Sequence, residues 1–345
     1  MKMKRILTLL LAMVLVFSLT ACTKNSEGGE GQPDSGITED VSDQTEQPDH
    51  EMIDVRVVAL TGPTALGMLG VIDSFDAYSL YQFEHKSAPD EVVAMLTSGA
   101  ADIAALPTNV AASLYNKTNG AVQIAALNTL GVLYVLSNGG EVASVADLKG
   151  KQLAASGQGS TAEYALNYIL NQNGIDPQNG ITIDYKAEHA ELATQMISGG
   201  IKLGMLPEPF VTQVTAKNPE VKVVLDLAKE WENAADNKTA MAMGCIVVRK
   251  EFAEQHPVEL SHFLDEYKAS AAGAVSDPAA TAELAEKYKV MDKAVAEKAL
   301  PKCNIVFMEG DEMKKTVTDF LTVLFEANEK SIGGKMPGED FFYER

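Results

Sequence analysis

Residues 98–107 read SGAADIAALP, and residues 198–207 read SGGIKLGMLP. Each stretch has a Ser-Gly turn, a short apolar run and a Leu-Pro end, and each follows a segment with helical spacing. Either turn signal alone could arise by chance, but the agreement in order and spacing favours a repeat. The repeat is too long and occurs too few times for a solenoid. The sequence therefore predicts an α/β protein with two similar lobes.

The segments around both stretches alternate between strand and helix patterns. In the first half we expect strands at 54–60, 79–84, 103–106 and 121–127, and helices at 89–97 and 110–117. In the second half we expect strands at 152–155, 181–185, 201–205, 221–225 and 243–249, and helices at 162–173, 188–197 and 210–216. From residue 251 the pattern is mostly helical, with a short strand near 305–307. This alternation predicts βαβ units and largely parallel sheets flanked by helices.

The composition is that of a globular protein with a substantial core, since 46% of the residues are hydrophobic and 22% are charged. The formal net charge of −20 argues against a nucleic-acid partner, because such proteins need basic patches. It does not by itself argue for a cationic ligand, since net charge describes the whole surface rather than one pocket.

The N-terminus has the pattern of an export signal. A basic start, MKMKR, precedes an apolar run at 6–19 and the sequence Leu-Thr-Ala-Cys. Residues 1–22 are thus predicted to be a lipoprotein signal peptide, with Cys22 as the lipidated residue; an ordinary secreted protein with an incidental Cys is the alternative. Residues 23–52 are polar and acidic and are predicted to be a disordered spacer. We expect an extracytoplasmic protein anchored to the membrane through its lipid.

Ligands of open parallel sheets bind beyond the carboxyl ends of the strands, where the chain turns into helices. The turns predicted there are rich in hydroxyls, amides and glycines, with one carboxylate and no Lys or Arg. The candidate ligand-binding residues are Thr61, Gly62, Pro63, Ser87, Thr108, Asn109, Asn128, Thr129, Ser156, Gly157, Gln158, Gly159, Ser160, Thr161 and Glu208.

Two of these turns carry specific expectations. In residues 156–161, SGQGST, free N–H groups at the following helix start would attract an anionic or strongly polar group, although an ordinary helix cap has the same sequence. The loop matches neither dinucleotide nor P-loop motifs. Glu208 lies between two prolines and either accepts hydrogen bonds from a ligand or stabilises a helix dipole.

The sequence gives little support to catalysis. The histidines are scattered, no HExxH motif is present, and no cofactor or metal site is expected. His85 could line the cleft but is more simply structural. The aromatic residues Trp231, Tyr78, Tyr81 and Tyr164 could stack on a ligand, but such residues usually belong to the core.

The remaining cysteines, Cys245 and Cys303, allow two readings. They could form a disulfide bridge in an exported protein, or they could be two buried free thiols that behave as small core residues.

Several motifs together resemble the extracytoplasmic substrate-binding proteins of ABC importers, especially the nitrate, sulfonate, taurine and thiamine-precursor group. The motifs are GPT after the first strand, DIAALPTN, LNTLGVLYV, DLKGK, ASGQGSTAEYAL and LPEPF, and the resemblance runs from about residue 53 to the C-terminus. It implies the periplasmic-binding-protein type II fold, in which two lobes close on a ligand in the cleft between them. It places residues 53–135 and 245–345 in lobe 1 and residues 136–244 in lobe 2.

The resemblance also implies a monomer that delivers a small molecule to an ABC permease and ATPase. The ligand would be a small polar or anionic molecule: a sulfonate, a nitrate-like anion or a pyrimidine-type nutrient. Relatives that bind anions use backbone N–H groups and hydroxyls, which residues 156–161 could supply. The absence of a basic residue and the presence of Glu208 depart from this pattern and favour a ligand with hydrogen-bond donors.

Two alternatives share the same fold. A membrane-anchored ligand sensor would use the same cleft with a different partner. An enzyme that resembles the synthases of a thiamine pyrimidine precursor would be cytosolic, which the export signal disfavours. We therefore expect a binding protein rather than an enzyme.

Overall fold

The computed structural model describes residues 52–74, 79–236 and 239–345. The signal peptide with Cys22, the spacer up to residue 51, and Tyr78 lie outside the described residues. The chain divides into two units, 1–48 and 49–345, and everything below concerns the second.

The first sheet contains six strands from two separate parts of the chain. In spatial order they are β11 (Ile305–Met308), β4 (Val122–Thr129), β10 (Gly244–Arg249), β3 (Ile103–Pro107), β1 (Ile53–Leu60) and β2 (Ser79–Lys86). Strand β1 runs parallel to β2 and β3, whereas β10 lies antiparallel between β3 and β4.

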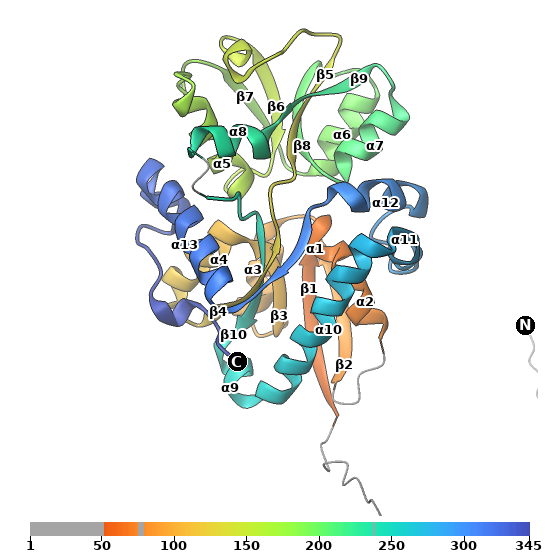
Figure 1. Cartoon of the computed structure of the whole chain (residues 1–345), viewed down its shortest axis with the longest axis vertical. Helices are drawn as coiled ribbons and strands as arrows, with labels where there is room; N and C mark the ends of the chain where they lie inside the picture. The colour runs from red at the N-terminus through yellow and green to blue at the C-terminus, as the bar shows by residue number, and fades with distance from the viewer. Residues whose placement is uncertain (1–51, 75–78, 237–238) are drawn as a thin grey trace, which may run out of the picture. The chain divides into compact units, whose positions relative to one another are not determined.

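Helices flank this sheet, and the C-terminal ones also reach toward the second (Figure 1). They are α1 (Pro63–Leu66), α2 (Leu69–Asp73), α3 (Pro89–Thr97), α4 (Thr108–Thr118), α9 (Lys250–Gln255), α10 (Pro257–Ser276), α11 (Pro278–Lys287), α12 (Lys293–Ala299) and α13 (Gly310–Ala327). Strand β1 is mostly apolar, and its residues Val55, Val57, Val58 and Ala59 are buried, as expected of a strand covered on both faces.

The second sheet is formed by one continuous part of the chain. Its strands are, in spatial order, β7 (Thr182–Lys186), β6 (Gln152–Ser156), β8 (Leu203–Pro207), β5 (Leu133–Asn138) and β9 (Val221–Asp226). Its helices are α5 (Thr161–Gln172), α6 (His189–Ile197), α7 (Phe210–Lys217) and α8 (Leu227–Ala234).

The two sheets repeat the same plan. The order β4-β10-β3-β1-β2 in the first corresponds to β9-β5-β8-β6-β7 in the second, with one antiparallel strand at the equivalent place, β10 or β5. The stretches SGAADIAALP and SGGIKLGMLP contribute β3 and β8, which are equivalent in this plan. The prediction of two similar α/β lobes is therefore confirmed, and the sheets are mixed because of β10 and β11 in the first and β5 in the second.

The chain crosses between the sheets twice, slightly earlier than expected from the sequence. Residues 133–135, which we placed in lobe 1, belong to β5 of the second sheet. Gly244, which we placed in lobe 2, begins β10 of the first sheet. Sequence patterns locate element ends only to within a few residues, and both differences are of that size.

The hydrophobic core is continuous between the lobes on one side of the molecule. Trp231 in α8 is fully buried, with ring centroids 4.9 Å from Tyr168 of α5 and 5.0 Å from Phe320 of α13. Its indole Nε1 donates to the carbonyl of Thr239 at 3.1 Å. The C-terminal helix α13 thus packs onto helices of the second sheet.

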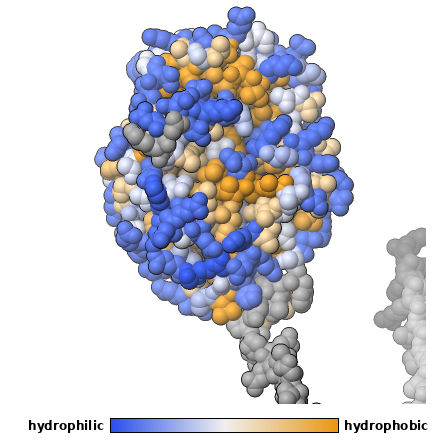
Figure 2. Space-filling view, in the orientation of Figure 1, coloured by the Kyte–Doolittle hydropathy of each residue, from blue (hydrophilic) through white to orange (hydrophobic). Residues whose placement is uncertain are grey.

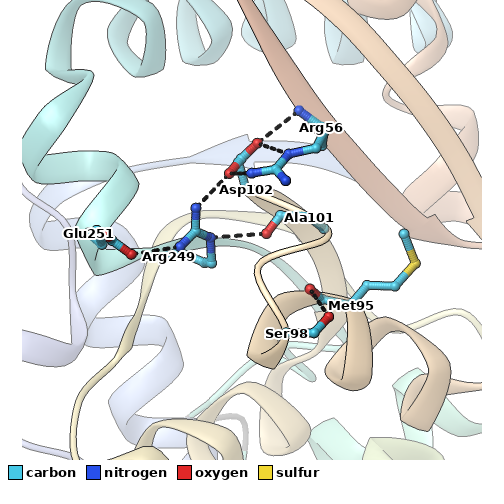
Figure 3. A network of polar contacts seen from close by, with 7 residues as sticks. All are labelled: Arg56, Met95, Ser98, Ala101, Asp102, Arg249 and Glu251. Carbon is cyan, nitrogen blue, oxygen red and sulfur yellow. Dashed lines mark hydrogen bonds and ion pairs between the residues drawn. The ribbon is translucent and has the colours of Figure 1, made fainter.

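An ion-pair network around the buried carboxylate of Asp102 lies in the first sheet (Figure 3). Asp102, 2% exposed, accepts hydrogen bonds from the backbone N, Nε and Nη2 of Arg56 and from Nη2 of Arg249. Arg249 also donates to the carbonyl of Ala101 and to Glu251. The network joins the starts of β1 and β3 to the end of β10. Since all three residues are remote from the crossings, we assign it to stability.

Over the described part of the chain, no helix combines the length and apolar character that a membrane span requires.

Candidate functional site

An inner cavity of about 90 Å³ lies where the strand ends of both lobes meet. The first sheet and its helices contribute neutral groups from the ends of β1, β3 and β4, and the second contributes groups from the start of α5 and the end of β8. The lining residues are Leu60, Thr61, Pro63, Thr64, Pro107, Thr129, Val132, Leu133, Ser160, Thr161, Ala162, His189, Pro207, Glu208, Met243 and Gly244.

An outer cavity of about 450 Å³ adjoins the inner one, since Thr61 and His189 line both. It is bounded by the turns before α3 and α6, by α7, and by the α11–α12 connection. Its other lining residues are Ser87, Glu188, Ala190, Phe210, Gln213, Glu286, Lys289, Val290, Met291, Asp292 and Val295. Figure 2 shows apolar residues across the middle of the molecule between hydrophilic areas.

Each lobe places a histidine against a hydroxyl at the end of its parallel strands. In the first, Thr61 Oγ1 lies 3.0 Å from His85 Nδ1, and in the second, Ser156 Oγ lies 2.7 Å from His189 Nδ1. Burial lowers the pKa of His189 to about 4, and burial followed by the charge of Lys86 lowers the pKa of His85. Both imidazoles are therefore neutral at pH 7 and can accept as well as donate hydrogen bonds.

Glu208 brings a carboxylate into the inner cavity, and its residue is only 1% exposed. Its two oxygens accept hydrogen bonds from Thr212, one from the backbone N and one from Oγ1, both at 3.0 Å. Burial raises the pKa of Glu208, while these hydrogen bonds and the charge of Lys302 oppose the shift. Its two readings are thus compatible: the carboxylate stabilises the start of α7 and also lines the cavity.

Asn109 joins the two lobes beside the cavity. Its Nδ2 donates to the carbonyls of Gly159, at 3.2 Å, and of Ser331, at 3.1 Å, and its Oδ1 accepts from Thr161 Oγ1 at 2.9 Å. Asn109 is 1% exposed, so these contacts are made away from water. We expected this amide to bind ligand, but both of its N–H donors and its oxygen already contact protein groups.

Replacing Asn109 with alanine is expected to favour an open arrangement of the lobes. Loss of the amide leaves the hydroxyl of Thr161 and two carbonyls without these partners, at a cost of about 1–3 kcal/mol to the closed arrangement. A larger radius of gyration in small-angle X-ray scattering would show the shift. Thr118→Ala is the control, because its hydroxyl bonds only to nearby backbone groups of the same lobe, those of Leu114, Tyr115 and Ala121. An unchanged radius in both variants would contradict the role assigned to Asn109.

The structure brings together six of the predicted binding residues at the inner cavity. These are Thr61, Pro63, Thr129, Ser160, Thr161 and Glu208, and Ser87 lines the outer cavity. The remaining candidates, all in the described part of the chain, line neither cavity: Gly62, Thr108, Asn109, Asn128, Ser156, Gly157, Gln158 and Gly159.

Several of these candidates support the site instead of lining it. Ser156 contacts His189, and Asn128 Oδ1 accepts a hydrogen bond from Thr129 Oγ1 at 3.1 Å. Gly157 has a positive φ of 82°, and a Cβ there would lie 2.9 Å from Ser160 Oγ, so the loop requires glycine at that place.

Sequence reasoning missed His189, which lines both cavities together with Thr61. It follows β7 by three residues, so the rule that selected the other strand ends would have found it had the turn after residues 181–185 been considered. It also missed the contribution of the α11–α12 connection, with Glu286, Lys289 and Asp292, because no strand-end rule points to a helical segment far along the chain.

Other candidate residues have structural surroundings. His85 contacts Thr61 but lines neither cavity, and Tyr81 packs edge-on against Phe263, 5.7 Å between ring centroids. Tyr164 borders a separate groove between α5 and α13.

Cys245 and Cys303 are free, buried thiols, which corresponds to the second of the two readings, and burial raises the pKa of both. Within the described residues there is no cluster of His, Cys, Asp and Glu suited to a metal ion.

A family model described as NMT1/THI5 like matches residues 82–281, which is more than half of the chain. The chain belongs to the NMT1/THI5-like family. The match begins in β2 and ends in α11, so it includes all of the second sheet and the predicted SGQGST and LPEPF segments. Comparison with curated proteins finds no significant match.

Solved structures similar to this NMT1/THI5-like protein share its fold. An ABC transporter structure from Parabacteroides distasonis has 23% identity and a TM-score of 0.70, covering 84% of this chain and 99% of that one. The alkanesulfonate-binding protein SsuA from Xanthomonas axonopodis pv. citri, bound to MOPS, has 13% identity and a TM-score of 0.64, with 83% and 94% covered. The nitrate-binding protein NrtA from Synechocystis PCC 6803 has 14% identity and a TM-score of 0.60, with 82% and 84% covered. The two-lobed periplasmic-binding-protein fold expected from the sequence is confirmed.

Proposed function

We propose that this protein is an extracytoplasmic solute-binding protein of an ABC importer. The observation that carries the proposal is the pair of adjoining cavities at the strand ends of two equivalent lobes, which His189 and Thr61 both line. Ligands of α/β sheets bind at this place, and two lobes joined by two crossings can close on a ligand by a hinge motion. The names of the alkanesulfonate-binding and nitrate-binding relatives are consistent with this role.

The mechanism follows from the geometry. A small molecule bound at the cavities contacts groups of both lobes, so it stabilises the closed arrangement over the open one. The Asn109 contacts with Gly159 and Thr161 add to that stabilisation, since they form only when the lobes approach. The closed complex would then deliver its ligand to a membrane permease whose ATPase drives import.

A ligand screen combined with a closure measurement tests this function. Sulfonates, nitrate, pyrimidines, amino acids and amines are added to the full chain in thermal-shift assays, since a bound ligand raises the apparent stability by mass action. Each hit is then examined by small-angle X-ray scattering for a decrease in the radius of gyration. Ligands that bind without any compaction of the lobes would contradict the proposal.

We also propose that residues 1–22 are a signal peptide, that Cys22 carries the lipid anchor, and that residues 23–52 are a spacer. The lipobox-like Leu-Thr-Ala-Cys sequence supports this. Cys22→Ser is expected to move the protein from the membrane fraction to the soluble fraction, measured by immunoblotting after fractionation. Cys245→Ser changes a buried thiol instead and is expected to leave the distribution unchanged. Retention of the Cys22→Ser variant in the membrane fraction would contradict the anchor.

We propose further that the protein binds its ligand without transforming it. The Ser156–His189 pair resembles part of a nucleophile–base pair, but Ser156 is 1% exposed and lines neither cavity. A nucleophile must reach its substrate. The pair therefore positions the imidazole of His189 at the cleft, and turnover of a bound ligand would contradict this assignment.

A further inference from the structure

In the second lobe, two of the helices that start at the cleft, α5 and α7, have a carboxylate of the protein itself hydrogen-bonded at their start. At the start of α5, Glu163 Oε2 accepts the N–H of Gly159 at 2.6 Å, and Ser160 Oγ accepts the N–H of Ala162. Free N–H groups at a helix start are what would hold an anionic ligand. In this structure Glu163, an acidic residue of α5, accepts the hydrogen bond of the Gly159 N–H. That N–H belongs to the SGQGST loop, which we expected to bind an anion.

The start of α7 shows the same arrangement. Glu208 directs one carboxylate oxygen to the backbone N of Thr212 and the other to its Oγ1. This carboxylate, unlike that of Glu163, also lines the inner cavity. An anionic ligand in the cavity would therefore lie close to a buried negative charge in surroundings where charges are weakly screened.

The charges of the outer cavity have the same sign. Glu188, Glu286 and Asp292 line it, against a single ammonium group, Lys289. His189 adds no positive charge at neutral pH, because burial keeps its imidazole unprotonated. Of the described residues that line the inner cavity, none is Lys or Arg.

Lys302 lies near Glu208 and its charge acts to lower the pKa of that carboxyl, but its ammonium group lines neither cavity. Its Nζ lies 3.5 Å from Thr212 Oγ1 and contacts the hydroxyl rather than the carboxylate. Lys302 is exposed to solvent and is absent from the linings of both cavities. Its attraction favours the ionised form of Glu208 and places no positive charge in either cavity.

We infer that the cleft takes a small organic cation, a compound with a protonated amine, and excludes simple anions such as sulfonates and nitrate. The ammonium group would enter past Glu188, Glu286 and Asp292 and bind beside Glu208. His189 and the hydroxyls of Thr61 and Ser160 would accept hydrogen bonds from its N–H groups, since each lines the inner cavity. This inference rests on the proposed solute-binding function and names its ligand class.

The test compares cations and anions of similar size on the full chain. Ethanolamine is the cationic probe, and methanesulfonate and nitrate are the anionic probes, each titrated by calorimetry at pH 7 and low ionic strength. We expect binding of ethanolamine and no binding of the anions at the same concentration. Glu208→Gln is expected to weaken ethanolamine binding at least about tenfold, because a charge-assisted hydrogen bond is replaced by a neutral one.

A matched variant separates the local carboxylate from the overall charge. Glu326→Gln makes the same charge change on an exposed position of α13 that lines neither cavity, and its affinity for ethanolamine should be unchanged. Equal losses in the two variants would attribute the effect to net charge and overturn the assignment of Glu208. Circular dichroism of the Glu208→Gln variant without ligand shows whether it folds. If that variant does not fold, Glu286→Gln, at the outer cavity, replaces it, again with an expected loss of affinity.

The outcomes for this inference and for the proposed function are distinct. Binding of methanesulfonate or nitrate with closure of the lobes would overturn the inference and support the proposed function. Failure of ethanolamine to bind would overturn the inference, whatever the anions do. Binding of ethanolamine without closure would support the ligand class and contradict the proposed hinge mechanism.

Discussion

Replacing Trp231 with alanine is expected to lower the free energy of unfolding by about 3–5 kcal/mol, as for other large aromatic residues in cores. The indole is fully buried between Tyr168 of α5 and Phe320 of α13, so its removal leaves a cavity that the neighbouring helices fill only partly. The hydrogen bond from Nε1 to the carbonyl of Thr239 is lost as well. Urea unfolding followed by far-UV circular dichroism measures the change.

Trp231→Phe is the matched control for this prediction. Phenylalanine keeps the contact with Phe320 and loses mainly the hydrogen bond, so the expected loss is smaller than for alanine. A loss below about 1 kcal/mol for Trp231→Ala would mean that the core between α8 and α13 does not couple the lobes. Helix α13 belongs to the first lobe and contacts α8 of the second through Phe320 and Trp231. Such a result would mean that this contact contributes little to the stability of the protein.

Replacing Asp102 with asparagine is expected to cost about 2–4 kcal/mol of stability. The carboxylate is 2% exposed and receives hydrogen bonds from two guanidinium groups, those of Arg56 and Arg249, and from one backbone N–H. Removing one partner from a buried ion pair leaves the other charges without compensation, and hydrogen bonds to charged groups are the stronger ones. Arg56 is partly exposed, which keeps the expected loss below that of a fully buried pair.

The same network predicts how stability depends on pH. Burial alone would raise the pKa of Asp102, but the hydrogen bonds from Arg56 and Arg249 outweigh it and hold the pKa below its usual value. A lowered pKa in the folded state contributes stability that is complete above the unfolded pKa, about 3.9, and is lost as the pH falls through the folded value. Asp102→Asn should therefore reduce the slope of stability against pH below about pH 4.

Glu251→Gln serves as the control for both measurements. Glu251 pairs with Arg249 at the surface, where its side chain is 66% exposed, so its loss should cost under about 1 kcal/mol. A stability loss for Asp102→Asn no larger than that for Glu251→Gln would contradict the role of the network. So would acid denaturation curves of the Asp102 variant that are parallel to those of the original protein.

Local sequence patterns were sufficient to predict most of the strands and helices, because apolar periodicity and turn residues are read over short windows. Helix α3 begins and ends as expected, and the repeated Ser-Gly and Leu-Pro signals located β3 and β8. They were not sufficient for β5, LYVLSN, where we expected no strand and where the first three residues were placed in lobe 1. The pairing of β5 with β8 and β9 depends on distant segments, which no local pattern reveals.

The sequence predicted the location of the candidate site better than it predicted which side chains line the cavities. Strand-end rules identify which residues lie near the cleft but not the direction of each side chain. Asn109 illustrates this, since its amide contacts Gly159, Thr161 and Ser331 rather than the cavity. His189 shows the opposite case, a residue without any motif that nevertheless lines both cavities.

The interior position of β10 has a consequence for how the protein is made. Strand β10 lies between β3 and β4, yet it is synthesised only after the whole second sheet. The strands of the second sheet can pair as soon as their own continuous segment has been synthesised. In the first sheet, β3 and β4 cannot complete their pairing until residues 244–249, which form β10, have been synthesised. Non-local pairing of this kind is slow, and unpaired strand edges aggregate. Residues 53–129, which supply β1 to β4 of the first sheet, are thus the part that needs protection while the nascent polypeptide is incomplete.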